Sequence, residues 1–241
     1  MGGFVDLQVA FPESLEKAES LAFHLRKLGF KAVALTVQNG GKPENLEEVK
    51  EVFSRHRVEA ALRVNLSPET SGRLLKDLRR LRGLFEIIGV ICCNKQVARQ
   101  AAKDHRVDLL LFPPGKLRLF DRAEVELASG SEAALELPLS SLLDVSGRQR
   151  LTYFWEAARA SRLALKRNIP VVLTSGAKDL YGLRAPRDLA AVGEAVYGLP
   201  SQAALASVSK VPWRILERNR EKLSQDFVEV GIRLVRRNGD C

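Results

Sequence analysis

Three basic residues in one short loop are the groups in this sequence best placed to do chemistry. Lys178, Arg184 and Arg187 follow the apolar run 171–173, which ends at Ser175-Gly176 and therefore predicts a buried strand. The strand delivers a glycine-containing basic loop to one end of the fold. Nothing in this loop pairs a nucleophile with a base, so the chemistry that it supports is the binding of an anion.

Four residues around these cations are predicted to fix the backbone of the loop. Ser175 and Gly176 end the strand, and Pro186 and Asp188 open the helix that follows. Pro186 suits the first helical position because the nitrogen at that position has no helical partner.

Further cations are expected where other strands end. They are Arg63, Lys95, Lys116, Arg118 and Arg148. Parallel strands collect their functional loops at their carboxyl ends, so these residues would share one rim with the first three. Such a rim suits the backbone of a folded RNA, which is recognised by shape and phosphate contacts. The alternative is that about half of these cations pair with neighbouring carboxylates such as Asp179 and Asp188.

Residues that could support hydrolysis are scattered. His24, His56 and His105 fall in or beside different elements, which predicts surface or packing roles and not metal ligation. Asp6 and Glu136 lie in strands and are expected to satisfy structural hydrogen bonds or salt links inside the fold.

The adjacent thiols of Cys92 and Cys93 end the fourth strand without a histidine to activate them, so both are predicted to be small buried residues. The sequence has no glycine-rich phosphate-binding motif and no RNA-stacking aromatic motif. We therefore predict no catalytic residue, no metal ligand and no cofactor bound by this chain.

The charge of the chain indicates a polyanionic partner. A formal net charge of +9 and a pI near 9.7 favour binding to phosphates, because clustered Lys and Arg displace condensed counterions. A membrane is a poorer partner because the cations are spread along the chain and no basic amphipathic segment gathers them. Three cysteines without zinc or disulfide spacing, and no leader-like segment, predict an intracellular protein.

About seven apolar strand-like runs alternate with amphipathic helices. The runs are 4–10, 32–37, 58–64, 87–92, 107–112, 134–137 and one from Val171. This predicts an α/β fold, a TIM-type (β/α) barrel in a single domain over 1–241, although an open doubly wound sheet is also compatible. Extra helices are expected after Ala191. Whether 228–235 is a last strand stays open, and 236–241 is expected to fray.

Two of the expected helices have distinctive side-chain patterns. Ser67-Pro68-Glu69 is expected to open the third helix, with its basic residues facing outward, and 147–168 is expected to be the longest helix. The apolar residues of this longest helix, expected on one face, are Leu151, Phe154, Trp155, Ala158 and Leu165.

With these residues in view, the chain resembles the ribonuclease P protein component 3 family. The resemblance rests mainly on two patterns, and strands elsewhere in the chain agree with it. The first pattern is 174–177 followed by 183–189. The second, further downstream, is Ala203-Ala204-Leu205, Ser209, Pro212, Ile215-Leu216 and Arg218-Asn219. Ala185 departs from the family, which usually has Ser there, so the helix that begins at Pro186 lacks a hydroxyl cap.

The resemblance implies a noncatalytic subunit of the RNA-based endonuclease that removes the 5′ leader of precursor tRNA. It implies a TIM-type barrel without metal ligands, a ribonuclease P RNA whose magnesium ions carry the chemistry, and pairing with protein component 2 in a heterotetramer of two pairs. Other ribonuclease P proteins and precursor tRNA would join this assembly. An archaeal origin would place the chain in the cytoplasm, and a eukaryotic one in the nucleolus.

Two enzyme hypotheses stay open beside this one. The first is a stand-alone barrel phosphoesterase whose metals are held by carboxylates such as Asp6 and Glu136. The second is a sugar-phosphate enzyme that uses the Gly176 loop for phosphate.

Overall fold

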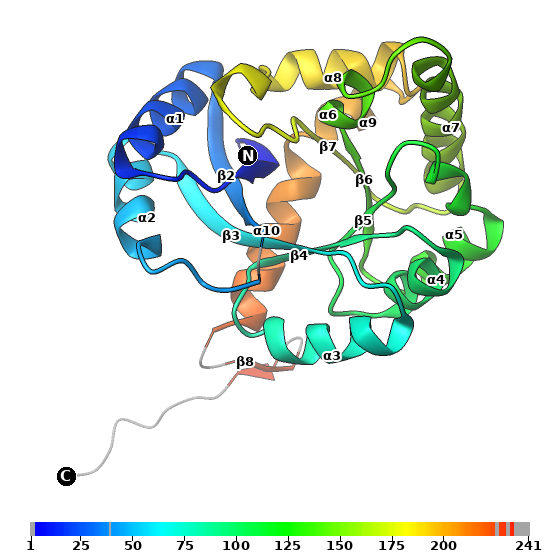
Figure 1. Cartoon of the computed structure of the whole chain (residues 1–241), viewed down its shortest axis with the longest axis horizontal. Helices are drawn as coiled ribbons and strands as arrows, with labels where there is room; N and C mark the ends of the chain where they lie inside the picture. Colours follow the sequence, from blue (N-terminus) through cyan, green and yellow to red (C-terminus); the bar gives the residue numbers. More distant parts are fainter. Residues whose placement is uncertain (1–2, 39, 225–226, 230–231, 234–241) are drawn as a thin grey trace.

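The computed structural model describes residues 3–38, 40–224, 227–229 and 232–233. Within these residues one sheet contains seven parallel strands in sequence order: β1 (Phe4–Ala10), β2 (Phe30–Val37), β3 (Glu59–Leu66), β4 (Ile87–Ile91), β5 (Leu109–Leu111), β6 (Ala134–Pro138) and β7 (Val171–Thr174). The strands form a nearly closed barrel surrounded by helices (Figure 1). The predicted distorted TIM-type barrel is confirmed.

The helices lie mostly outside the strands. They are α1 (Leu15–Leu28), α2 (Leu46–Arg55), α3 (Ser71–Leu81), α4 (Lys95–Lys103), α5 (Arg122–Ser129), α6 (Leu139–Leu143), α7 (Gly147–Lys166), α8 (Pro186–Ala195), α9 (Ser201–Ala206) and α10 (Lys210–Lys222), with 3-10 turns η1 (Leu117–Leu119) and η2 (Leu180–Gly182). In the described ranges, no helix is long and apolar enough to cross a membrane.

The barrel closes between its first and last strands in two different ways. Near the carboxyl ends, Val9 bridges Ala177, and the Ala10 N–H donates to the Ala177 carbonyl at 2.8 Å. Nearer the amino ends, Val5 donates to the Val208 carbonyl at 2.9 Å. The segment between α9 and α10 therefore takes the place of an eighth strand, which explains why the sequence shows only seven.

Helix α10 covers the amino-terminal end of the barrel and lies behind the strands in Figure 1. Ile215 and Leu216 pack into the barrel interior. Asn219 Nδ2 donates to Asp108 Oδ1 and to the Glu86 carbonyl, both at 2.8 Å, and an Arg218 Nη2 N–H donates to Asp108 Oδ1 at 2.9 Å. The downstream family pattern thus encodes a plug with an apolar face and a hydrogen-bonded polar face.

Two expectations from the sequence are resolved by the structure, one about the start of a helix and one about the segment 228–235. Helix α3 begins at Ser71 and not at Ser67, because Thr70 Oγ1 accepts from the Arg73 N–H and provides the N-cap. Strands β8 (Phe227–Glu229) and β9 (Ile232–Arg233) form a separate antiparallel pair, so the segment 228–235 that the sequence left open supplies no barrel strand among its described residues. The expectation for 236–241 lies outside the described residues.

The outward face of α7 also differs from expectation. Its buried residues are Tyr153, Ala157, Ala160, Ser161 and Ala164, so mostly small residues bring this helix close to the barrel. Phe154, Ala158 and Leu165 are partly buried. The side chains of Leu151 and Trp155, predicted to pack inward with them, are 59% and 74% exposed.

Candidate nucleic-acid interface

The guanidinium of Arg63 lies inside the barrel and is fully buried. It donates to both carboxylate oxygens of Glu136, at 2.9 and 2.6 Å, and to the Leu7 carbonyl at 2.6 Å. The prediction that Arg63 belongs to the basic rim is therefore wrong. From Leu62 to Leu66 apolar and polar residues alternate along β3, and the polar ones, Arg63 and Asn65, face the barrel interior. The alternation does not say which face of the strand is enclosed, so the sequence alone did not distinguish an interior arginine from one on the rim.

A neighbouring glycine makes room for this buried arginine. A Cβ at Gly89 would lie 2.5 Å from Asn65 Oδ1 and 3.0 Å from Arg63 Nη2. Asn65 Oδ1 also accepts from Arg63 Nε at 2.9 Å. Any side chain on β4 at this point would collide with Asn65 and with the arginine. Gly89 therefore leaves the space in which the Arg63–Glu136 pair lies.

Both interior carboxylates have protein partners, as the sequence predicted. Glu136 accepts a further bond from Thr174 Oγ1 at 2.8 Å. Asp6 accepts from the backbone N–H groups of Ser175 and Gln8, at 3.2 and 3.1 Å. Burial raises the pKa of Asp6 to about 6, against the lowering effect of these hydrogen bonds.

The turn after β7 explains the first family pattern. Ser175 Oγ accepts from the Ala177 N–H at 3.1 Å, and Gly176 has φ +65°, a left-handed conformation. A Cβ at Gly176 would overlap the Ser140 hydroxyl. The turn therefore fixes where Lys178 and the residues after it leave the barrel.

The helix after this turn begins at Pro186, the position expected from the sequence. Ala185 occupies the N-cap and makes no side-chain cap bond, although its carbonyl accepts from the Asp188 N–H at 3.0 Å. The Asp188 side chain is exposed in the first turn. The positive end of the helix dipole stabilises a carboxylate at this place.

The three cations of this loop differ in availability. Lys178 is 79% exposed, and its Nζ lies 3.3 Å from Asp144 Oδ2; Asp179, the partner considered from sequence, instead accepts from the Gly182 N–H. Arg184 Nη1 donates to the Tyr181 and Leu183 carbonyls, both at 2.7 Å, so it shapes the loop. Arg187 is exposed and has no side-chain partner in the described part of the chain.

The remaining predicted cations are on the outside of the molecule. Lys116 and Arg118 are exposed at η1, and Arg148 is exposed in the first turn of α7; none has a side-chain partner among the residues described. Lys95 forms an ion pair with Asp121. Some of these cations are thus free for phosphate, and Lys95 is held by a carboxylate.

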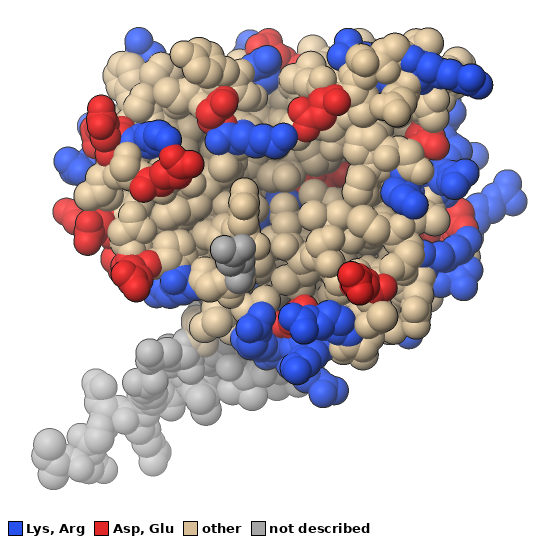
Figure 2. All heavy atoms as spheres, viewed as in Figure 1, with Lys and Arg blue, Asp and Glu red and all other residues tan. Residues whose placement is uncertain are grey.

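The larger concentration of positive charge lies on helices, whereas the sequence analysis placed the basic residues at strand ends. Helices α3, α4 and α7 contain twelve Lys or Arg and two Asp or Glu, whereas α1 and α2 contain five of each. Figure 2 shows Lys and Arg gathered over α3 and along the side of α5 and α7, with both signs mixed over α1 and α2. The spacing of Lys95, Arg99 and Lys103, one helical turn apart, was the available signal.

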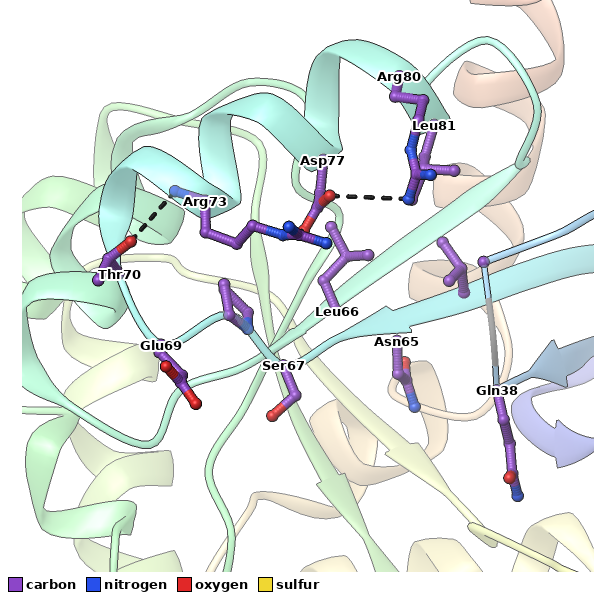
Figure 3. Close-up of a pocket in the computed structure, with 13 residues that line it drawn as sticks. Gln38, Asn65, Leu66, Ser67, Glu69, Thr70, Arg73, Asp77, Arg80 and Leu81 are labelled. Atoms are coloured by element: carbon purple, nitrogen blue, oxygen red, sulfur yellow. Dashed lines mark hydrogen bonds and ion pairs between the residues drawn. The ribbon is translucent and has the colours of Figure 1, made fainter.

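A cavity of about 540 Å³ adjoins this basic flank, between α3 and the carboxyl ends of β2 and β3. Figure 3 shows Arg73, Asp77 and Arg80 along one wall, with Gln38 and Asn65 on strand-end segments across from them. Arg73 Nε donates to Asp77 at 2.9 Å, and Arg80 lies 3.7 Å from the same carboxylate. Glu69 also lines the cavity, so its two arginines are matched by two carboxylates and the cavity lining has no net charge.

The groups that could support other chemistry are dispersed. His24 and His105 are exposed, and His56 contacts Glu19 at 2.5 Å. The described residues contain no group of three or more His, Cys, Asp or Glu arranged to hold a metal ion. Cys92 is buried, as predicted, and burial raises the pKa of its thiol. Cys93 is exposed, so its predicted burial is wrong. The pairing with β5 continues as far as Cys92, whose N–H donates to the Leu111 carbonyl, and Cys93 lies beyond it.

Comparison of sequences relates this arrangement to known proteins. A family model described as RNase P subunit p30 matches residues 3–224. A Ribonuclease P protein component 3 from Methanosarcina barkeri is 27% identical over 212 residues, which cover 88% of this chain and 87% of that protein. One from Methanococcoides burtonii is 25% identical over 236 residues and covers 96% and 93%.

Comparison of structures gives the same fold. A chain from a cryo-EM structure of archaeal Ribonuclease P with mature tRNA superposes with a TM-score of 0.84 at 21% identity, over 97% of this chain and all of that one. The A. niger ochratoxinase superposes with a TM-score of 0.56 at 11% identity, over 90% of this chain and 71% of that one. At these identities the likeness concerns the barrel alone.

Proposed function

Because the chain belongs to the RNase P subunit p30 family, we infer that it is a protein subunit of ribonuclease P, the RNA-based endoribonuclease that removes the 5′ leader of precursor tRNA. The chain by itself is not the catalyst. The RNA subunit, with magnesium ions bound to it, performs the hydrolysis. The family match over most of the chain is the observation that carries this conclusion.

The basic flank formed by α3, α4 and α7 is the surface that we assign to the RNA, together with the exposed cations Lys116, Arg118, Arg148, Lys178 and Arg187. Arg184 shapes the loop that presents two of them, and Lys95 contributes once its ion pair with Asp121 opens. A surface of one sign attracts the phosphate backbone and gains affinity by releasing counterions. Such contacts position the RNA without reading its sequence.

We propose the partners that the resemblance to ribonuclease P protein component 3 implies. The chain pairs with protein component 2, two such pairs form a heterotetramer, and other ribonuclease P proteins and precursor tRNA complete the assembly. The relatives named above are archaeal, which supports a cytoplasmic location.

The interior geometry weighs against a stand-alone phosphoesterase. The two carboxylates considered as metal ligands, Asp6 and Glu136, are engaged by Ser175 and Arg63. A guanidinium with two hydrogen bonds to Glu136 occupies the space next to that carboxylate. Metal ligation would therefore require this pair to be broken.

Reconstitution of cleavage tests the function. The assay combines a 5′-labelled precursor tRNA with the ribonuclease P RNA and component 2, with and without this chain, at a magnesium concentration too low for the RNA alone. Cleavage only when the chain is present is the expected result. Cleavage by the chain after all RNA has been removed, abolished by a chelator, would overturn it in favour of the phosphoesterase.

A charge-matched pair of variants tests the assigned surface. Replacing Arg79, Arg99 and Lys103 by Ala should lower the slope of log affinity for the RNA against log salt by about two to three, since each lost phosphate contact removes roughly 0.7–0.9. The control replaces Arg26, Lys27 and Arg55, which lie on α1 and α2, and removes the same net charge. Equal effects of the two triples would refute the location of the surface.

A further inference from the structure

Trp155 is the most exposed tryptophan in the described part of the chain. It is 74% exposed on the outward face of α7, and Leu151, one turn earlier, is 59% exposed. The sequence has two tryptophans. The other, Trp213, is partly buried and donates its indole N–H to Glu217 at 2.7 Å. The ring of Trp155 is therefore exposed to solvent and does not pack in the core.

Arginines flank this indole on the same helix face. Arg148, Arg159 and Arg162 are separated from Leu151 and Trp155 by steps of three or four residues, which align side chains along one side of a helix. Arg148 and Arg162 are exposed and have no side-chain partner among the residues described. Arg159 donates one N–H to the Leu117 carbonyl at 3.1 Å, which holds its guanidinium beside η1.

The charge balance selects the kind of partner. Helix α7 contains five Lys or Arg and one Asp or Glu, and Figure 2 shows this side of the molecule crowded with cations. An apolar patch alone is typical of a protein interface. An aromatic ring among unpaired arginines suits single-stranded nucleic acid, whose bases stack while its phosphates bind cations.

We propose that the outward face of α7 binds a single-stranded segment of RNA, with one unpaired base stacked on Trp155 and the adjoining phosphates on Arg148 and Arg162. The proposal rests on the inferred role as an RNA-supporting subunit and adds to it a contact with an unpaired base. Each arginine is seven residues from Trp155, or about 10 Å along the helix axis. A duplex cannot make the same contact because its base faces are covered.

A groove extends this path beyond the tryptophan. A cavity of about 590 Å³ lies between α5 and the end of α7. Its lining includes the apolar side chains of Val125 and Leu163 and the cations Arg122, Lys166 and Arg167. Arg167 is paired with Glu126 at 3.0 Å, which leaves Arg122 and Lys166 for the next phosphates.

Fluorescence tests the stacking directly. In the full chain with Trp213→Phe, emission reports Trp155 alone, and a short oligouridylate is titrated against a short RNA duplex. We expect the single strand to quench the emission and the duplex to leave it nearly unchanged. Trp213 packs against the barrel, and its replacement can disturb the fold. The binding of labelled oligouridylate is therefore also measured in the parent background, the chain that keeps Trp213.

Three variants in that background give the decisive comparison. Trp155→Ala should weaken oligouridylate binding by about tenfold to a hundredfold, the loss of one base–aromatic stack, and Trp155→Phe should retain most of the affinity. Phe23→Ala is the control, since Phe23 is an aromatic side chain 44% exposed on α1, outside the basic flank, and also has a cation beside it, Lys27 Nζ at 4.7 Å from the ring centroid. It should bind as the parent does.

Each other outcome has a defined meaning. Unchanged Trp155 emission on RNA binding, or unchanged affinity in Trp155→Ala, overturns the proposal. Protection of Trp155 by component 2 without RNA would identify a protein interface and also overturn it. If Trp155→Ala has no effect while the wild-type chain still supports precursor-tRNA cleavage, the stacking site fails and the proposed function stands. Failure of the wild-type chain to support cleavage overturns the function instead.

Discussion

Replacing Arg63 by Met should destabilise the barrel severely without touching the RNA surface. The substitution leaves Glu136 buried, with Thr174 Oγ1 as its remaining side-chain donor. Removing one partner of a buried ion pair costs about 3–5 kcal/mol, since the other charge loses its compensation. For a chain of this length, that loss lowers the melting temperature by about 6–20 °C, at about 2–4 °C per kcal/mol.

Variants at Glu136 separate the contribution of the ion pair from that of the packing around it. Glu136→Leu alone should also destabilise the protein, because Arg63 stays buried with only the Leu7 carbonyl and Asn65 as partners. The double variant removes both charges, so it should be more stable than Arg63→Met by at least about 2 kcal/mol. Urea unfolding of all four proteins gives the coupling energy between the two side chains.

Two results would refute this reasoning. The first is a cost below about 1 kcal/mol for Arg63→Met, the value of an exposed ion pair. The second is a double variant as unstable as the sum of the single ones. Below its melting temperature, Arg63→Met should also keep the parent slope of RNA affinity against salt, because this guanidinium faces no phosphate. A lowered slope would return Arg63 to the RNA surface.

Three further predictions concern single side chains. Ala185→Ser should raise the free energy of unfolding by about 1 kcal/mol by supplying the missing N-cap, which urea unfolding measures. Gly176→Ala should cost at least about 2 kcal/mol, from its positive φ and its overlap with Ser140, whereas Gly83→Ala, in open space, should cost little. The folded-state pKa of Asp6, about 6, lies above the unfolded value of 3.8, so the folded state binds the proton more tightly. Stability from this group is present below about pH 4 and is lost as the pH rises to about 6. Relative to Asp6→Asn, the parent should lose about 3 kcal/mol over that range, and parallel curves would refute the shift.

The sequence by itself determined the local elements. Ser14 and Asp121 cap helices, Gly29 ends α1 at φ 94°, and Pro186 opens α8, each in a role that its residue type favours. These features depend on contacts within a few residues, which a linear pattern contains. The alternation of seven apolar runs with helices predicted parallel strands, but it was compatible with a barrel and with an open sheet. The contacts of β1 with Ala177 and Val208 decide for the barrel.

Tertiary structure decided which side chains meet the solvent. Arg63 and Lys178 are both cations near strand ends, yet the first is enclosed by Glu136 and Leu7 and the second is 79% exposed. The apolar residues of α7 were equally ambiguous, because the helix buries a face rich in alanine and leaves Trp155 outside. The concentration of cations on α3, α4 and α7 likewise depends on which helices the barrel places on one flank. Burial and charge grouping arise from contacts between residues far apart in the chain. Local spacing shows which cations share one face of a helix, but it does not show which helices share a flank of the barrel.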